Sequence, residues 1–369
     1  MSTKLLDLAI EIQQIPAPTF SESLRADFVK AKFIEEGLAD VSQDEVGNVF
    51  ARLAGSGTGL PLVAVAHLDT VFPIETDLET RRELGKVFGA GLGDNSLGVA
   101  ALFGLVWLIR QRRIKLGGDL WLVADVGEEG LGDLSGMREV VKRFGADPST
   151  GSGHGVRGYL IVEGLALGHV YQRAIGVRRY RVTARTAGGH SWSDYGQPSA
   201  VHELARLVTQ LTALHVPLQP RTTLNIGVIA GGTTVNTLAA EAWFELDLRS
   251  EDADTLTVLA EQAEKLIAAA NRLGVNMEAR VTSQRPSGEI SPNHPLMRLA
   301  LDCLREQGMD GNLTAGSTDA NIPLSLGIPA VVLGVTTGGG AHSKHEFIHT
   351  EPIEQGMEQL VSFVSRAWD

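Results

Sequence analysis

The strongest constraint on the fold is an alternation of short, unbroken apolar runs with helical segments in the first half of the chain. The apolar runs are residues 62–66, 120–126 and 159–162, and the helical segments between them are 99–110 and a stretch near 134–144. Strands that are apolar on both faces are typical of parallel sheets covered by helices on both sides. The pattern therefore predicts an α/β domain with a mostly parallel sheet.

The middle of the chain has a different order of elements. Its periodicity predicts strand, helix, strand, strand, helix and strand, over residues 178–186, 199–214, 223–230, 242–249, 256–267 and 275–281. That order is the split ferredoxin-like motif, which can fold as a domain of its own. Helix and strand alternate again after Pro295, so we expect one α/β domain, residues 1–174 and 284–369, interrupted by an α+β domain, residues 175–283.

A helix is expected near the N-terminus between Ser21 and Gly37. Serine is a common N-cap residue, and glycine often ends a helix. Leu24, Phe28 and Ala31 recur at helical spacing, so we expect them to form its buried face.

Charge, cysteine count and hydropathy limit the classes of function. The 369 residues include 32 Lys and Arg against 44 Asp and Glu, a formal net charge of -12 at pH 7, so no nucleic-acid partner is expected. The single cysteine, Cys303, cannot form an internal disulfide, which favours a reducing compartment. The longest apolar stretch, residues 99–109, is shorter than the roughly 18 residues of a membrane span. Residues 1–14 lack the features of a secretory signal, so we expect a cytoplasmic protein without a membrane partner.

Acidic and histidine residues gather where the predicted strands end. His67 and Asp69 follow the first apolar run, Glu128 and Glu129 follow the second, and Glu163 follows the third. A further carboxylate, that of position 94, lies in a glycine-rich loop, residues 89–98, before a predicted helix. Ligands of open α/β sheets bind at the carboxyl ends of the strands, so these side chains are expected to converge there.

Such a group of side chains suits a divalent metal. Imidazole with carboxylate oxygens is a donor set that zinc accepts, and carboxylates brought together without a cation would repel one another. A carboxylate on a loop can bridge two ions about 3.5 to 4 Å apart, and Asp94 is the expected bridge. Asp69 can orient the imidazole of His67. One of Glu128 and Glu129 would bind metal and the other would accept a proton from water, and the residues alone leave open which.

Each piece also has a simpler interpretation. A lone His-x-Asp is more often a local hydrogen-bonded pair, two adjacent glutamates before a glycine are usually a solvated turn, and residues 89–98 could be a flexible connection. The glycine-rich loop is not a dinucleotide fingerprint, because Asp94 stands where the last glycine should be. Ser96 lies one residue short of the spacing of a nucleophile elbow, which argues against a serine hydrolase.

Taken together and in order, the motifs resemble those of a known family. They are His67-Leu-Asp69-Thr-Val, Gly91-Leu-Gly-Asp94-Asn-Ser-Leu-Gly98, Glu128-Glu129-Gly130, Glu163-Gly164, Gly188-Gly-His190-Ser and His342-Ser-Lys-His345-Glu346. The resemblance is to the dinuclear zinc metallohydrolases, which include carboxypeptidase G, peptidase T, aminoacylase, acetylornithine deacetylase and succinyl-diaminopimelate desuccinylase, and it covers nearly the whole chain.

The resemblance implies two zinc ions per chain, for which cobalt or manganese could substitute. By similarity, one zinc would be held by His67, Asp94 and Glu163, and the other by Asp94, Glu129 and His342. Glu128 would be the general base for a metal-activated water, with Asp69 as the orienting residue.

The inserted domain resembles the lid and dimerisation domain of that family, which implies a homodimer formed through residues 175–283. His190 matches a histidine that polarises the scissile carbonyl across the dimer, and Asn236 matches a residue that stabilises the oxyanion. Arg249 matches an arginine that binds a substrate carboxylate, and Gly316 and Ser317 resemble a loop that binds the substrate backbone. Without the resemblance, His190 would be read as part of a surface turn and Arg249 as one half of a salt bridge.

The expected activity is hydrolysis of amide bonds in small peptides, of the carboxypeptidase, dipeptidase or tripeptidase kind. The alternative is deacylation of N-acyl amino acids, in the manner of acetylornithine deacetylase or the desuccinylase. A catalytically inactive homologue that only binds ligands is the least favoured, because the set of ligands and base is complete.

Overall fold

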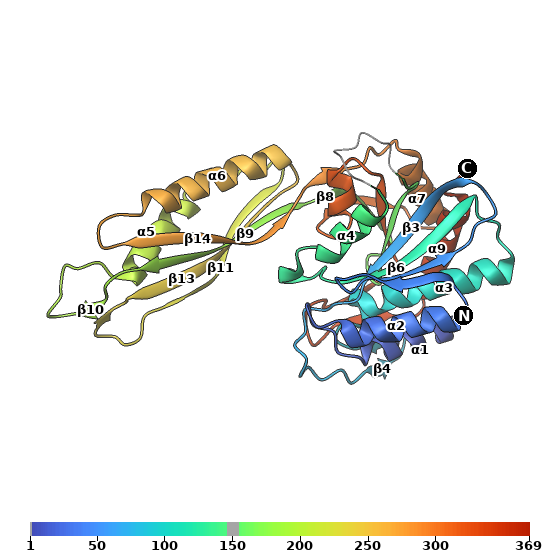
Figure 1. Cartoon of the computed structure of the whole chain (residues 1–369), viewed down its shortest axis with the longest axis horizontal. Helices are drawn as coiled ribbons and strands as arrows, with labels where there is room; N and C mark the ends of the chain where they lie inside the picture. The colour runs from blue at the N-terminus through green and yellow to red at the C-terminus, as the bar shows by residue number, and fades with distance from the viewer. Residues whose placement is uncertain (1, 146–154) are drawn as a thin grey trace. The chain divides into compact units, whose positions relative to one another are not determined.

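The chain forms two compact units in the computed structural model, which describes residues 2–145 and 155–369. The first unit comprises residues 1–174 and 289–369, and the second comprises residues 175–288. The second unit begins at the expected residue, 175, and extends five residues beyond the expected end at residue 283. Each unit has its own hydrophobic core, and both are drawn in Figure 1.

A nine-stranded sheet forms the centre of the first unit. The strands β6, β3, β7 and β17 run parallel to one another, whereas β1 and β2 add an antiparallel edge. In order across the sheet the strands are β1 (Ala39–Gln43), β2 (Val49–Leu53), β6 (Gly118–Asp125), β3 (Gly59–His67), β7 (Gly158–Glu163), β17 (Ala330–Gly334), β8 (His169–Ala174) and β15 (Gly288–Glu289), and β16 (Asn312–Gly316) pairs with β8. The α/β class with a mostly parallel sheet is confirmed.

The apolar helix α3 (Leu97–Arg112) lies in the core of this unit. It packs on β3 and β7 and is covered by α1 (Ser2–Gln13) and α9 (Ile353–Arg366). Together with the short helical turn η1 (Leu92–Ser96) it forms the one segment of the described chain that is long and apolar enough to cross a membrane, and 89% of its most apolar window is buried inside the fold. The other helices of the unit are α2 (Ser23–Glu35), the turn η2 (Gly130–Gly132), α4 (Ser135–Arg143), α7 (Pro295–Glu306) and α8 (Asn321–Ser325).

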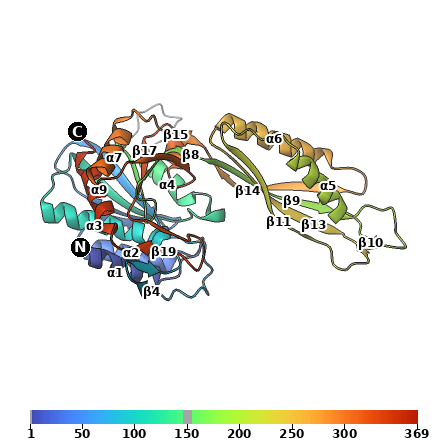
Figure 2. The same ribbon diagram turned by 180° about the vertical axis from the view of Figure 1, so that it is seen from behind.

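A small second sheet joins two segments that are distant in the sequence. Its order is β18 (Gly338–Gly339), β19 (Phe347–His349), β5 (Lys86–Phe88) and β4 (Arg81–Glu83). Figure 2 shows β19 close to β4 on this side of the unit. The pairing of β19 with β5 brings the loop between β18 and β19 next to the glycine-rich loop that follows β5.

The buried face of α2 differs from the expected one. Leu24 is 66% exposed, and the helix buries Arg25, Ala26, Val29 and Phe33 instead. The expected cap at Ser21 is also wrong, because the helix begins at Ser23 with Glu22 at its N-cap. Arg25 lies on the buried face, where its guanidinium donates hydrogen bonds to the backbone carbonyls of Leu68 and Ile15.

The second unit has the predicted order of strands and helices. Its sheet is antiparallel, in the order β11 (Thr222–Gly231), β13 (Glu241–Ser250), β9 (Gly176–Arg185) and β14 (Asn276–Arg285). The helices α5 (Ala200–Thr212) and α6 (Ala253–Ala269) pack on the face that carries the alternate apolar residues of β13. Beyond this sheet, β10 (Gly189–His190) and β12 (Thr237–Leu238) form a two-stranded arm (Figure 1).

The core position of α3 leads to a stability prediction. Phe103 is 1% exposed, and its ring stacks on that of Phe33 with centroids 4.7 Å apart. We expect Phe103→Ala to lower the free energy of unfolding by about 3–5 kcal/mol in urea denaturation, because it leaves a cavity. Leu84→Ala, at a fully exposed position, is the control and is expected to change it by less than about 0.5 kcal/mol. Equal effects of the two substitutions would contradict the assignment of this helix to the core.

Candidate functional site

Three neighbouring parallel strands bring titratable side chains to one edge of the large sheet. His67 is the last residue of β3, Asp125 the last of β6 and Glu163 the last of β7. His67 pairs with Asp125 in the register of the two strands. Because carboxyl ends of parallel strands meet at one edge, the strand pairing itself assembles the site.

The first group of possible metal ligands joins two of these strand ends to the glycine-rich loop. Nε2 of His67 lies 3.1 Å from Oδ1 of Asp94 and 3.8 Å from Oε2 of Glu163. The imidazole of His67 is 2% exposed, whereas the two carboxylates keep some access to solvent. One ligand atom from each residue lies within 4.8 Å of the others, a spacing that could surround one ion.

The second group shares a residue with the first. Nε2 of His342 lies 3.1 Å from Oδ2 of Asp94 and 3.1 Å from Oε1 of Glu129. Asp94 thus directs one carboxylate oxygen to each histidine. This is the arrangement of a carboxylate that bridges two ions.

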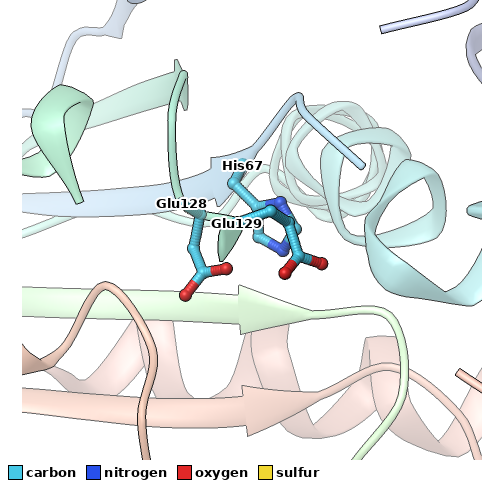
Figure 3. Close-up of side chains that lie close together, drawn as sticks. All are labelled: His67, Glu128 and Glu129. Atoms are coloured by element: carbon cyan, nitrogen blue, oxygen red, sulfur yellow. The ribbon is translucent and has the colours of Figure 1, made fainter. Parts of the chain in front are cut away.

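Glu128 lies beside the two groups. Its carboxylate oxygen, an oxygen of Glu129 and a ring nitrogen of His67 are all within 4.8 Å of one another. Figure 3 shows the two glutamate side chains pointing apart from adjacent backbone positions. Both are buried, so a charge on either is poorly compensated by solvent.

The charges of the site depend on one another. Burial alone would lower the pKa of His67, but hydrogen bonds with Asp69 and Asp94 raise it well above its usual value. Burial raises the pKa of Glu163 well above its ordinary range. Hydrogen bonds with Asp94 and Glu129 raise the pKa of His342 to about 10. The upward pKa shifts of both histidines are caused by the carboxylates beside them, so each group concentrates negative charge around an imidazole.

A divalent cation would balance the same charges. The donor set of two imidazoles and several carboxylates matches zinc and related ions. Each group offers three ligand atoms that lie within 4.8 Å of one another. The residues present therefore fit a pair of metal ions.

Asp69 contacts more than its expected partner. Its Oδ1 accepts a hydrogen bond from the backbone N–H of Glu128 at 3.0 Å, and its Oδ2 accepts one from Glu129 at 2.9 Å. Nδ1 of His67 lies 3.6 Å from the Asp69 carboxylate and 3.1 Å from the Asp69 backbone carbonyl. The carboxylate therefore holds the turn that carries both glutamates, as well as lying beside the imidazole.

Two further buried residues hold nearby backbone, Arg25 next to Asp69 and Glu22 in the turn itself, and neither contact was expected from the sequence. The guanidinium of Arg25 is 1% exposed and donates to the carbonyls of Leu68 at 2.7 Å and Ile15 at 2.6 Å. Oε1 of Glu22 accepts from the backbone N–H of Gly127 at 3.2 Å. Their partners are distant in the sequence, so no local pattern identifies them.

In the second unit, His190 and Asn236 are neighbours on the two-stranded arm. The backbone N–H of Ser191 donates to the carbonyl of Asn236 at 2.9 Å. Nδ1 of His190 accepts hydrogen bonds from the backbone N–H groups of Trp192 at 3.2 Å and Ser193 at 3.4 Å. Because Nδ1 is an acceptor, the neutral ring carries its proton on Nε2.

Arg249 lies apart from that arm within the same unit. It is near the end of β13, eight residues beyond Glu241, which at roughly 3.3 Å per residue is about 26 Å. Its Nε donates to Oδ1 of Asp247 at 2.7 Å, so it takes part in an ion pair at the strand end. The structure brings His190 and Asn236 together and leaves Arg249 at a distance from both.

Gly316 and Ser317 lie where β16 ends and a loop leads to α8. The same loop contains Asp319, which is fully buried. Burial, and then the nearby charge of Asp319, raise the pKa of Asp125 well above its ordinary value. This loop therefore lies next to the edge of the sheet that carries the two groups of ligands.

The sequence and the fold are similar to those of known peptidases. The chain is 32% identical to a peptidase M20 domain-containing protein of Schizosaccharomyces pombe over 268 residues, which are 70% of this chain and 63% of that protein. Its fold is similar to that of a Staphylococcus aureus tripeptidase, with a TM-score of 0.82 and 22% identity over 100% of this chain and 98% of the other. It is also similar to a dinuclear metal-binding M20 peptidase of Bacillus subtilis, with a TM-score of 0.69 and 16% identity over 99% and 97% of the chains.

A match to a family model establishes the family to which the chain belongs. The model of peptidase family M20/M25/M40 matches residues 63–366, which include all the side chains of both groups. This confirms the family expected from the motifs and the expected class of enzyme, a metallopeptidase. The chain belongs to peptidase family M20/M25/M40.

Proposed function

We propose that this protein hydrolyses amide bonds in small peptides with the help of two divalent metal ions. The observation that carries the proposal is the position of Asp94, whose two carboxylate oxygens each lie 3.1 Å from a different histidine. The similarity in fold to a tripeptidase supports peptides as the substrate class.

The metal ions would be held by the two groups of side chains. His67, Asp94 and Glu163 would hold one ion, and Asp94, Glu129 and His342 the other. Zinc suits this donor set, and cobalt or manganese could replace it. Two bound ions would supply the Lewis acidity that lets water lose a proton near neutral pH.

The metal assignment predicts a binding stoichiometry. We expect the purified wild-type protein to bind two zinc ions per chain by elemental analysis after dialysis, and His342→Ala to bind one, because the His67 group stays intact. Arg298→Ala, an exposed substitution outside both groups, should still bind two. No bound metal under zinc-replete conditions would refute the assignment and favour an inactive binding homologue.

Glu128 is the proposed general base. Its carboxylate would accept the proton of the attacking water and return it to the leaving nitrogen. Glu129 is turned to His342, which leaves the adjacent Glu128 to handle the proton. The hydrogen bonds from both backbone N–H groups to Asp69 support this division, because they fix the turn from which the side chains diverge.

Substitution of Glu128 tests the base. We expect Glu128→Gln to lower kcat for dipeptides and tripeptides by about 10²–10⁴-fold, because the amide cannot accept the proton. Zinc content should stay at two per chain, which separates loss of the base from loss of the metal. Wild-type turnover by the metal-loaded variant would exclude Glu128 as the base. Assays of N-acetyl amino acids alongside peptides test the alternative activity, deacylation.

His190 and Asn236 are proposed to bind the carbonyl oxygen of the scissile bond. The Nε2–H of His190 can donate a hydrogen bond to that oxygen as negative charge develops on it. Gly316 and Ser317 would bind the peptide backbone, and the guanidinium of Arg249 would bind a substrate carboxylate. A small peptide cannot span the roughly 26 Å of β13 between Arg249 and Glu241, the end of the strand that follows the arm in the chain.

That distance favours a homodimer formed through the second unit, in which two copies contribute to one site. Large apolar side chains on the arm agree with a partner, since Trp192 is 86% exposed and Tyr195 is 89% exposed.

The free, buried Cys303 is compatible with a reducing compartment, and we place the protein in the cytoplasm.

Mixing two inactive variants tests the shared site. His190→Ala lacks the donor and Glu128→Gln lacks the base, so each homodimer should be inactive. After dissociation and random reassociation, the mixture should regain about a quarter of the wild-type activity, because half the dimers then contain one complete site. If His190 acts within its own chain, no activity will return, and this arrangement of the dimer is wrong.

A further inference from the structure

The carboxylate of Glu346 is fully buried and accepts three backbone hydrogen bonds from the glycine-rich loop. Its Oε2 accepts from Gly91 at 3.0 Å, and its Oε1 accepts from Gly93 at 2.7 Å and from Asp94 at 3.0 Å. The backbone carbonyl of Glu346 also accepts from the N–H of Gly89 at 3.0 Å. A single residue therefore docks the segment between β18 and β19 onto the loop that carries Asp94.

His342 lies in the same docked segment. Its backbone has a φ of 63°, in the left-handed region, which is sterically unfavourable for a residue other than glycine. Such a conformation persists where surrounding contacts determine it. The contacts of Glu346, four residues later, hold this segment against the Asp94 loop.

A different residue connects Asp94 to the other group of ligands. The Nδ2 of Asn95 donates to the carbonyl of Val162 at 2.9 Å, and its Oδ1 accepts from the N–H of Gly164 at 2.7 Å. These two partners flank Glu163 at the end of β7. The buried amide of Asn95 therefore fixes the Asp94 loop relative to Glu163, independently of Glu346.

We infer that Asn95 and Glu346 are positioning residues that act on different metals. Asn95 sets the geometry of Asp94 with His67 and Glu163, and Glu346 sets the geometry of Asp94 with His342 and Glu129. The inference rests on the proposed pair of metal ions. The two contacts explain how the carboxylate of Asp94 can face both groups at once, because Asn95 holds its loop beside Glu163 and Glu346 holds it beside the segment of His342.

An amide cannot replace the carboxylate of Glu346. Both of its oxygens accept N–H groups, so Glu346→Gln would set an NH₂ group against at least one backbone N–H. Asp252 provides a control carboxylate in the second unit, because its Oδ1 accepts both from the backbone N–H of Thr255 at 2.8 Å and from the hydroxyl of Thr255 at 2.6 Å. Asp252→Asn can keep that oxygen in place.

The two positions can be tested one metal at a time by zinc titration calorimetry. In a His67→Ala background, only the group with His342 remains, and Glu346→Gln should weaken zinc binding by about 10- to 100-fold. In a His342→Ala background, the same substitution should leave affinity within about twofold, because the hydrogen bonds of Asn95 still hold the Asp94 loop beside Glu163. Asn95→Ala should weaken zinc binding in the His342→Ala background and leave it within about twofold in the His67→Ala background. Asp252→Asn should change neither affinity.

The result that would overturn the inference is equal weakening in both backgrounds, or no weakening in either. Thermal unfolding of the metal-free variants detects general loss of structure, which would weaken both sites together. If His67→Ala and His342→Ala bind no zinc while the wild type binds two, the sites cannot be separated and the inference fails. If the wild type binds fewer than two ions, the proposed metal pair fails as well.

Discussion

The structure of the site depends on several carboxylates lying close together, with the carboxylate of Asp94 shared between two groups. Asp94 contacts two histidines, one on a strand of the central sheet and one on a loop near the C-terminus. Carboxylates of Glu129 and Glu163 complete the two groups. Negative charges this close together and this buried need positive charge at their centre, and that requirement links the sheet, the glycine-rich loop and the C-terminal loop into one site.

Buried carboxylates position the possible metal ligands by accepting hydrogen bonds from the backbone N–H groups of the loops that carry them. Asp69 holds the turn of Glu128 and Glu129, Glu22 holds the preceding Gly127, and Glu346 holds the loop of Asp94. A hydrogen bond to a charged acceptor is stronger than one between neutral groups. These hydrogen bonds hold the loops that carry the possible metal ligands in one geometry, and a pair of metal ions requires such a defined geometry.

Much of this arrangement could be predicted because its signals are local in the sequence. His67 and Glu163 end apolar runs, and the carboxyl ends of such strands meet at one edge of a parallel sheet. The face of α2 could not be predicted in this way. Arg25 is buried because the carbonyls of Ile15 and Leu68 accept its hydrogen bonds, and neither partner is visible in the periodicity of the helix.

The sequence by itself determined the family, the α/β class and the residue types that gather at the strand ends. These follow from strand periodicity and from the order of the motifs, both of which are local properties of the sequence. Only the tertiary structure decided which of those residues lie together in each group of possible metal ligands. It placed Asp94 between two histidines, turned Glu129 to His342, and made Glu346 and Asn95 the supports of one loop. The physical reason is that these contacts join segments far apart in the sequence, whose distances are set by the packing of sheet and helices.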